Sequence, residues 1–216
     1  MPALPPPRCP QSISHLRAGL PELDVSRETS DLLVRFEELV RAENERQNLV
    51  AASTLDDFAT RHVDDALQLV DLGGRTGSWC DIGSGAGLPG MVIAIVTKAP
   101  VTLVEPRRLR ADFLRRTSEE LGLTNVSVIA SKAQNAAGSF DIVTARAVAA
   151  LGDLFAMTMH LAHSGTRWIL PKGRNAKNEL EAARQTWQGR FSLVPSRTSE
   201  EAMIIVADQV GRRGKR

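Results

Sequence analysis

The first third of the chain carries the pattern of two amphipathic helices. After Ser30-Asp31, which could cap a helix, apolar residues recur with the i, i+4, i+7 and i+8 spacing of one helix face: Leu32, Leu33, Phe36, Leu39 and Val40. A second stripe of this kind starts near Thr54 and ends at the Gly73-Gly74 pair. Before both, five of the 11 prolines fall within the first ten residues. The sequence therefore predicts a proline-rich arm over residues 1–26 and a helical cap over residues 27–74.

From residue 78 onward, short apolar runs alternate with helical patterns. The predicted strands are Ser78–Ile82, Val101–Val104, Val126–Ile129, Phe140–Val143 and Arg167–Leu170, with Phe191–Val194 and Met203–Ala207 as a closing hairpin. One predicted helix begins near Pro89. Three others cover Arg108–Glu120, Leu151–Leu161 and Asn178–Trp187. Such alternation is typical of a mostly parallel sheet with helices on both faces. We therefore expect a doubly wound α/β domain over residues 75–210, with its ligand at the carboxyl ends of the strands.

Composition narrows the class of protein further. Hydrophobic residues make up 43% and charged residues 24% of the 216 positions, which is ordinary for a globular protein and excludes disorder as the main state. The longest apolar run, Met91–Val96, is too short to span a bilayer, and the first residues lack the pattern of a signal peptide. Two cysteines cannot build a disulfide framework. These features predict a cytoplasmic protein, and nothing in them demands more than a monomer.

The excess of positive charge lies at the end of the chain. The last five residues, Arg212-Arg213-Gly214-Lys215-Arg216, carry four positive charges, more than the formal net charge of +2. A basic tail over residues 211–216 could contact nucleic acid. The alternative is a solvated end without a partner.

A glycine-rich loop follows the first predicted strand and admits two cofactors. Gly85-Ala86-Gly87-Leu88-Pro89-Gly90 satisfies the dinucleotide pattern, with Glu105 twenty residues after Gly85. However, Asp81 places a carboxylate at the mouth of the loop, where it would repel a pyrophosphate, and Pro89 lacks a backbone N–H for binding an anion. S-adenosylmethionine carries a sulfonium and an ammonium group, both favoured by a carboxylate, and Glu105 could accept hydrogen bonds from its ribose. Charge thus favours S-adenosylmethionine as the cofactor. The alternative is NAD, which would make the protein an NAD-dependent oxidoreductase.

The same loop carries a resemblance to a known family. The run Asp81–Gly90, with its Leu-Pro-Gly ending, resembles the signature of the bacterial guanine-N7 methyltransferases of small-subunit (16S) ribosomal RNA, the RsmG or glucose-inhibited division protein B group. The likeness covers nearly the whole chain and includes Asn48-Leu49, Arg61-His62-x-x-Asp65, Arg110-x-x-Phe113-Leu114-Arg115, Ala145-Arg146-Ala147 and Lys172-Gly173. Four positions depart from the family pattern. Lys132 and Gln134 stand where the family usually has Arg and Glu, and Glu43 and Ala66 stand where it has Trp and Ser.

The resemblance implies a fold, an activity and a set of contacts. The fold would be that of a class I S-adenosylmethionine-dependent methyltransferase with a helical N-terminal extension. The activity would be methyl transfer to N7 of a guanine, with ribosomal RNA or the small ribosomal subunit as partner. A non-catalytic RNA-binding module on the same fold is a further alternative. The resemblance also implies cofactor contacts at Gly83, Leu88, Ala133, Gln134 and Arg146.

Methyl transfer to guanine N7 requires little acid–base chemistry from the protein. Guanine N7 has a free lone pair and no proton to lose, so the site must position the reactants and needs no general base. We therefore predict no catalytic residue in the strict sense. Arg146, Lys172 and Arg174 end or follow strands on the cofactor edge, where they could bind the RNA substrate. His62 and Asp65 share one helix face, either as a local pair or at the rim of the site. The four histidines lack metal-ligand spacing, so no metal is expected.

Overall fold

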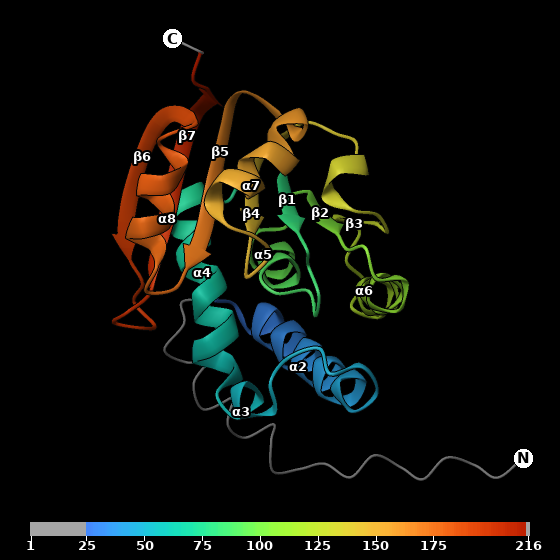
Figure 1. Ribbon diagram of the computed structural model, residues 1–216. Coiled ribbons are helices and arrows are strands. Elements are labelled where there is room, and N and C mark those ends of the chain that lie inside the picture. Colours follow the sequence, from blue (N-terminus) through green and yellow to red (C-terminus); the bar gives the residue numbers. More distant parts are fainter. Residues whose placement is uncertain (1–24, 215–216) are drawn as a thin grey trace, which may run out of the picture.

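A seven-stranded sheet forms the centre of the computed structural model, which describes residues 25–214 (Figure 1). The strand order is β3-β2-β1-β4-β5-β7-β6, and the first five strands of the chain run parallel to one another. β7 is antiparallel to both of its neighbours. The strands are β1 (Trp79–Ile82), β2 (Val101–Val104), β3 (Val126–Ile129), β4 (Phe140–Ala145), β5 (Ala162–Lys172), β6 (Trp187–Pro195) and β7 (Met203–Arg212). The predicted doubly wound sheet with a closing hairpin is confirmed.

Helices cover both faces of the sheet and divide the hydrophobic core in two. One cluster packs the sheet against α2 (Arg27–Gln47), α4 (Asp65–Gly73), α5 (Gly90–Thr97) and α6 (Arg108–Glu120). The other packs it against α7 (Leu151–Thr158) and α8 (Ala176–Ala183). All four residues of β1 are buried, as expected for a central parallel strand whose two faces are both covered.

The N-terminal helices differ from the prediction in their boundaries. α2 starts at Arg27, because Ser26 caps it by accepting a hydrogen bond from the Thr29 backbone N–H at 3.3 Å; the predicted cap at Ser30-Asp31 is wrong. The second predicted helix is broken into α3 (Ala52–Leu55), a π-helical turn η2 (Ala59–Asp64) and α4. His62 lies in this wide turn and is buried, which a regular helical pattern does not indicate.

Boundaries also shift at the C-terminal end. The helix predicted over Asn178–Trp187 ends at Ala183, and Trp187 instead begins β6, where its buried ring packs 5.6 Å from that of Phe155. A 3-10 turn, η4 (Met159–Leu161), follows α7. β7 runs through Arg212, which lies over the Trp187 ring at 5.3 Å, so two residues assigned to the basic tail belong to the sheet. The last two residues and most of the predicted arm lie outside the described residues.

The parallel strands end at one edge of the sheet, where the N-terminal helices meet it. In Figure 1, α2 and α3 lie below the tips of β1 and β4, next to the lower end of α4. The glycine loop and the ends of β2, β4 and β5 therefore open onto one region.

Across residues 25–214, no helix combines the length and hydropathy that a bilayer-spanning segment needs.

Candidate cofactor and substrate site

At Gly83 and Gly90 the glycine loop is shaped by close contacts that leave no room for a side chain. Gly83 has φ 69°, and a Cβ there would lie 2.7 Å from the Val148 side chain. A Cβ on Gly90 would lie 2.4 Å from Leu103 and 2.7 Å from an Asp81 oxygen. These contacts bring the start of α5 directly over the end of β1.

Asp81 is buried beneath this loop, not at its mouth as the sequence suggested. Its carboxylate is 1% exposed, and Oδ2 accepts a hydrogen bond from the Gly90 backbone N–H at 3.1 Å. Within the described part of the chain, Oδ1 has no hydrogen-bond partner, and neither has Oγ1 of Thr144, its register neighbour on β4. Burial raises the pKa of Asp81 to about 7. A buried carboxyl group with one unpartnered oxygen is suited to accept a hydrogen bond from a positively charged group.

Glu105 joins the loop to the next helix. It is 3% exposed; Oε2 accepts from the Gly85 N–H at 2.9 Å and Oε1 from the Arg107 N–H at 2.8 Å. Each carboxylate oxygen can accept a second hydrogen bond, so the predicted ribose contact at Glu105 stays a prediction.

The other expected cofactor residues take different positions. Ala133 is buried and Gln134 is exposed, both in the 3-10 turn η3 (Ala133–Asn135) after β3, on the same edge as the glycine loop. The Leu88 side chain packs into the hydrophobic core, which leaves its backbone as the group that could face a ligand. The structure therefore brings these residues to the correct edge, and their contacts with a cofactor stay predictions.

Arg146 lies between the glycine loop and the N-terminal helices. It follows β4, and its Nη1 lies 3.2 Å from Nδ1 of His62 and 3.9 Å from Oδ2 of Asp65. Burial, then the positive charge of Arg146, lowers the pKa of His62 to about 3, so the imidazole is neutral at physiological pH. Burial also lowers the pKa of Arg146, an effect opposed by Asp65 and then by Asp81. Both acids therefore favour the charged form of the guanidinium.

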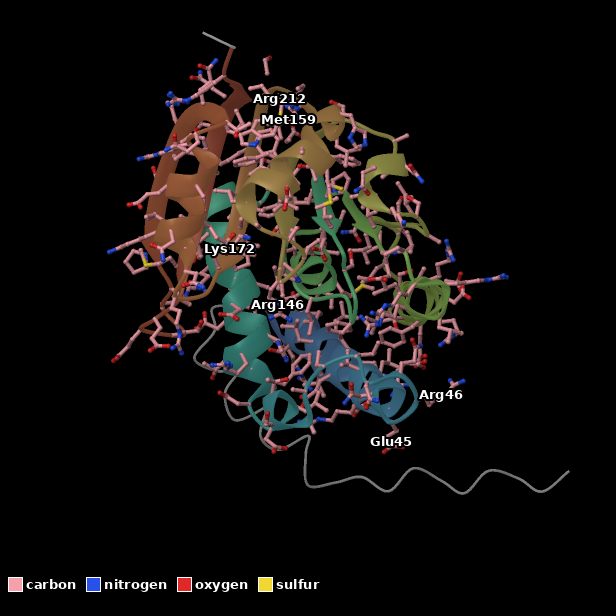
Figure 2. The ribbon with its side chains drawn as sticks, in the orientation of Figure 1. Glu45, Arg46, Arg146, Met159, Lys172 and Arg212 are labelled. Carbon is pink, nitrogen blue, oxygen red and sulfur yellow. The ribbon has the colours of Figure 1, made fainter. Side chains whose placement is uncertain are left out.

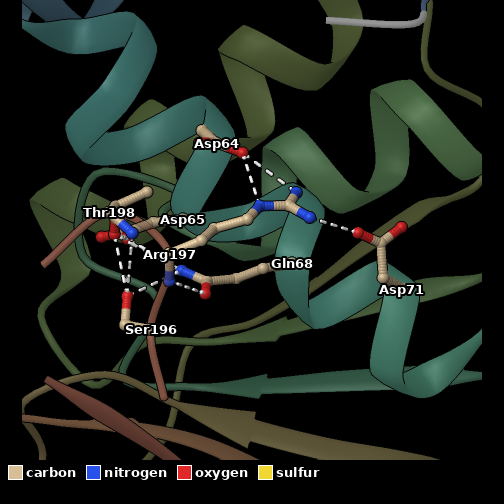
Figure 3. Close-up of polar contacts among 7 residues, drawn as sticks. All are labelled: Asp64, Asp65, Gln68, Asp71, Ser196, Arg197 and Thr198. Atoms are coloured by element: carbon tan, nitrogen blue, oxygen red, sulfur yellow. Dashed lines mark hydrogen bonds and ion pairs between the residues drawn. The ribbon is translucent and has the colours of Figure 1, made fainter. Parts of the chain in front are cut away.

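Asp65 is held in turn by the β6–β7 connection (Figure 3). Its Oδ1 accepts hydrogen bonds from the Thr198 hydroxyl and from Nε2 of Gln68, the latter at 3.1 Å. Arg197 pairs with Asp64 at 2.9 Å and with Asp71 at 2.7 Å. We call Arg197, Thr198 and their partners on η2 and α4 the latch. The sequence did not predict the latch, because its two halves lie more than 120 residues apart and no motif connects them.

A cleft of about 640 Å³ opens beside Arg146, lined by Asp65, Arg146, Lys172 and residues of the β6–β7 connection. Lys172 lies in this cleft, with its ammonium donating to Glu179 and to the Ala149 carbonyl, both at 2.8 Å. Arg174 is exposed outside the cleft and pairs with Glu201 at 2.8 Å. The structure thus unites Arg146 with Lys172 and leaves Arg174 apart.

In residues 25–214, no group of acidic, histidine or cysteine side chains is arranged to hold a metal ion.

Comparison with known proteins identifies the family. The sequence matches the family described as GidB, rRNA small subunit methyltransferase G, over residues 29–201. The ribosomal RNA small subunit methyltransferase G of Rhizorhabdus wittichii is 46% identical over 196 residues, covering 88% of this chain and 90% of the relative. The chain belongs to the rRNA small subunit methyltransferase G family. The protein of the same name from Zymomonas mobilis is 41% identical, with coverage of 87% and 89%. Both the resemblance and the methyltransferase class expected from the sequence are confirmed.

Solved structures share the fold of this chain. A SAM-dependent methyltransferase from Aquifex aeolicus superposes with a TM-score of 0.57 at 13% identity, covering 70% of this chain and 92% of that one. A mutant of MtNAS in complex with S-adenosylmethionine gives 0.55 at 19% identity, covering 91% and 86%. These similarities confirm the predicted class I methyltransferase fold.

The residues present fit S-adenosylmethionine on chemical grounds. The unused Asp81 oxygen lies in a buried position where an ammonium group could satisfy it, and no side chain projects from Gly83. A dinucleotide would place a pyrophosphate above two buried acids, Asp81 and Glu105. The family and the site therefore both favour the methyl donor over the nicotinamide alternative.

Proposed function

We propose that this protein transfers a methyl group from S-adenosylmethionine to N7 of a guanine in small-subunit ribosomal RNA. The observation that carries the proposal is the buried Asp81 carboxylate, with one unpartnered oxygen, beneath a glycine loop in a chain of the rRNA small subunit methyltransferase G family. When bound, the cofactor supplies a methyl group on a positively charged sulfur.

The cofactor side of the site is assigned to three groups. Asp81 binds the ammonium group through its free oxygen, a charge-assisted contact. Glu105 orders the loop through its two backbone hydrogen bonds and accepts from the ribose with its remaining lone pairs. Ala133 and Gln134 border the adenine, since their turn follows β3 on the same edge.

The acceptor side is assigned to the cleft beside Arg146. Guanine presents its O6 oxygen next to N7, and a guanidinium donates readily to such an oxygen. The neutral His62 and the carboxylate of Asp65 both contact Arg146, so its guanidinium has a fixed position. No proton leaves N7 during the reaction. These side chains position the base and need not change their protonation state.

A reconstituted reaction tests the proposal. Small-subunit ribosomal RNA, and separately whole small subunits, are taken from cells that lack the protein and incubated with it and S-adenosylmethionine. Mass spectrometry of the digested nucleosides should show 7-methylguanosine with the wild type and a strong reduction with Arg146→Gln. Methylation at another atom would overturn the assignment of N7, and transfer to neither substrate would overturn the function.

The proposed function also implies a macromolecular partner and a cellular compartment. Ribosomal RNA or the small subunit is the macromolecular partner, and both are found in the cytoplasm, where we place the protein. We also propose that the protein is active as a monomer. Sedimentation at the concentration of the methylation assay tests this.

A further inference from the structure

A dense group of arginines lies at the N-terminus of α6, apart from the cleft. Arg46, Arg107, Arg108 and Arg110 surround Leu109, and together with Gln47 they line a hollow of about 450 Å³. We call this group the arginine patch. Leu109 is 69% exposed, one of the two large hydrophobic side chains that are exposed among residues 25–214.

The charges of the arginine patch are weakly neutralised. Arg46 lies 3.4 Å from Glu43 and Arg108 lies 3.9 Å from Asp112, with side chains that are 73% and 92% exposed. In the described part of the chain, Arg107 and Arg110 have no acid within ion-pair distance. α6 also has no acidic residue in its first turn, so its positive dipole end adds to the same field.

The arginine patch adjoins the cofactor loop. A Cβ on Gly85 would lie 3.8 Å from Nη1 of Arg110, and Glu105 links the backbones of Gly85 and Arg107. The end of α2 is tied to the patch, since Gln47 donates to the Leu109 carbonyl at 3.1 Å. Figure 2 shows Arg46 at the end of α2 and Arg146 nearer to α4.

We infer that the arginine patch binds backbone phosphates of the RNA that presents its target base to the Arg146 cleft. Exposed guanidinium groups are good bidentate phosphate ligands, and an anionic strand crossing α6 would pass beside the glycine loop. Leu109 provides an apolar contact for a ribose or base between the charges. This inference rests on the proposed function, because it assumes an RNA substrate.

The test removes three charges that lie outside the cofactor and acceptor machinery. The variant R46Q/R107Q/R108Q is compared with R75Q/R184Q/R190Q, which removes three exposed arginines from the opposite edge of the sheet. Binding to a transcript of small-subunit ribosomal RNA is measured at several salt concentrations. Melting and S-adenosylmethionine binding by calorimetry confirm that each variant is folded.

The inference predicts a difference between the two variants. Loss of three phosphate contacts should lower the slope of log K against log salt by about 2 and weaken binding about tenfold or more, with little change in the control. In the methylation assay, KM for RNA should rise while kcat is maintained. Equal losses in both variants, or none in the patch variant, would overturn the inference. Failure of the proposed function would appear instead as absence of methylation by the wild type.

Discussion

The two halves of the proposed site are built in different ways. On the cofactor half, Asp81 and Glu105 are held by backbone N–H groups of the glycine loop and the start of α6. On the substrate half, Arg146 is held by side chains of η2 and α4, which the latch fixes from the far end of the chain. The cofactor half therefore depends on a short run of backbone geometry, and the substrate half depends on side-chain pairs that single substitutions can remove.

The largest effect is expected on the cofactor half. Asp81→Asn retains the shape of the side chain and removes its charge, so S-adenosylmethionine should bind about 10- to 100-fold more weakly, since hydrogen bonds to charged groups are the stronger ones. Calorimetry measures this directly. The variant should melt no lower than the wild type, because a buried acid with an unused oxygen is itself costly. An exposed acid on α7 gives the control Asp153→Asn, and equal losses in both would contradict the assignment.

The backbone of the same half can be tested through a glycine. Gly90→Ala would place a methyl group against Leu103 and Asp81, and should destabilise the fold by about 2 kcal/mol. Gly211→Ala is the matched control, because a Cβ there meets nothing within 4 Å. Chemical denaturation measures both. A Gly90→Ala variant as stable as the control would show that the loop is less tightly packed than described.

This contrast also explains how much could be predicted from the sequence. The sheet, the glycine loop and the two acids were predictable, because strand periodicity and contiguous motifs determine them. The π turn that buries His62, the pairing of Lys172 with Glu179 and the latch were not, since they depend on side chains that only the tertiary fold brings together. The deep burial of Asp81 was unpredictable for the same reason. A motif specifies which residues meet a ligand, but not how far the neighbouring helix covers them.

The latch offers a smaller test on the substrate half. Arg197→Gln removes the pairs with Asp64 and Asp71, which are partly exposed and so contribute less than about 1 kcal/mol to stability. The expected consequence is functional: looser placement of Asp65 and Arg146 should lower kcat for RNA methylation several-fold, with S-adenosylmethionine affinity retained. Arg197→Lys, which restores one charge, should recover part of the rate. Arg190→Gln, which removes a single ion pair between β6 and β7, is the control and should leave kcat unchanged. A loss of stability that matched the loss of rate would mean that the latch serves only the fold.

The smallest expected effect is a pH dependence that separates binding from stability. Since the pKa of Asp81 is about 7 in the folded protein and 3.8 in an exposed carboxyl, the folded chain keeps a proton that the unfolded chain has lost. Stability of the free protein should therefore fall as pH rises through this interval. Cofactor affinity should change in the opposite direction, rising several-fold from about pH 6 toward 7.5, because only the ionised carboxylate attracts an ammonium group. Above that, an α-amino group itself begins to lose its charge, and affinity should decline. Asp81→Asn should abolish the rise and retain the decline. Parallel slopes for stability and affinity in the wild type would show that Asp81 is not the group that senses the cofactor.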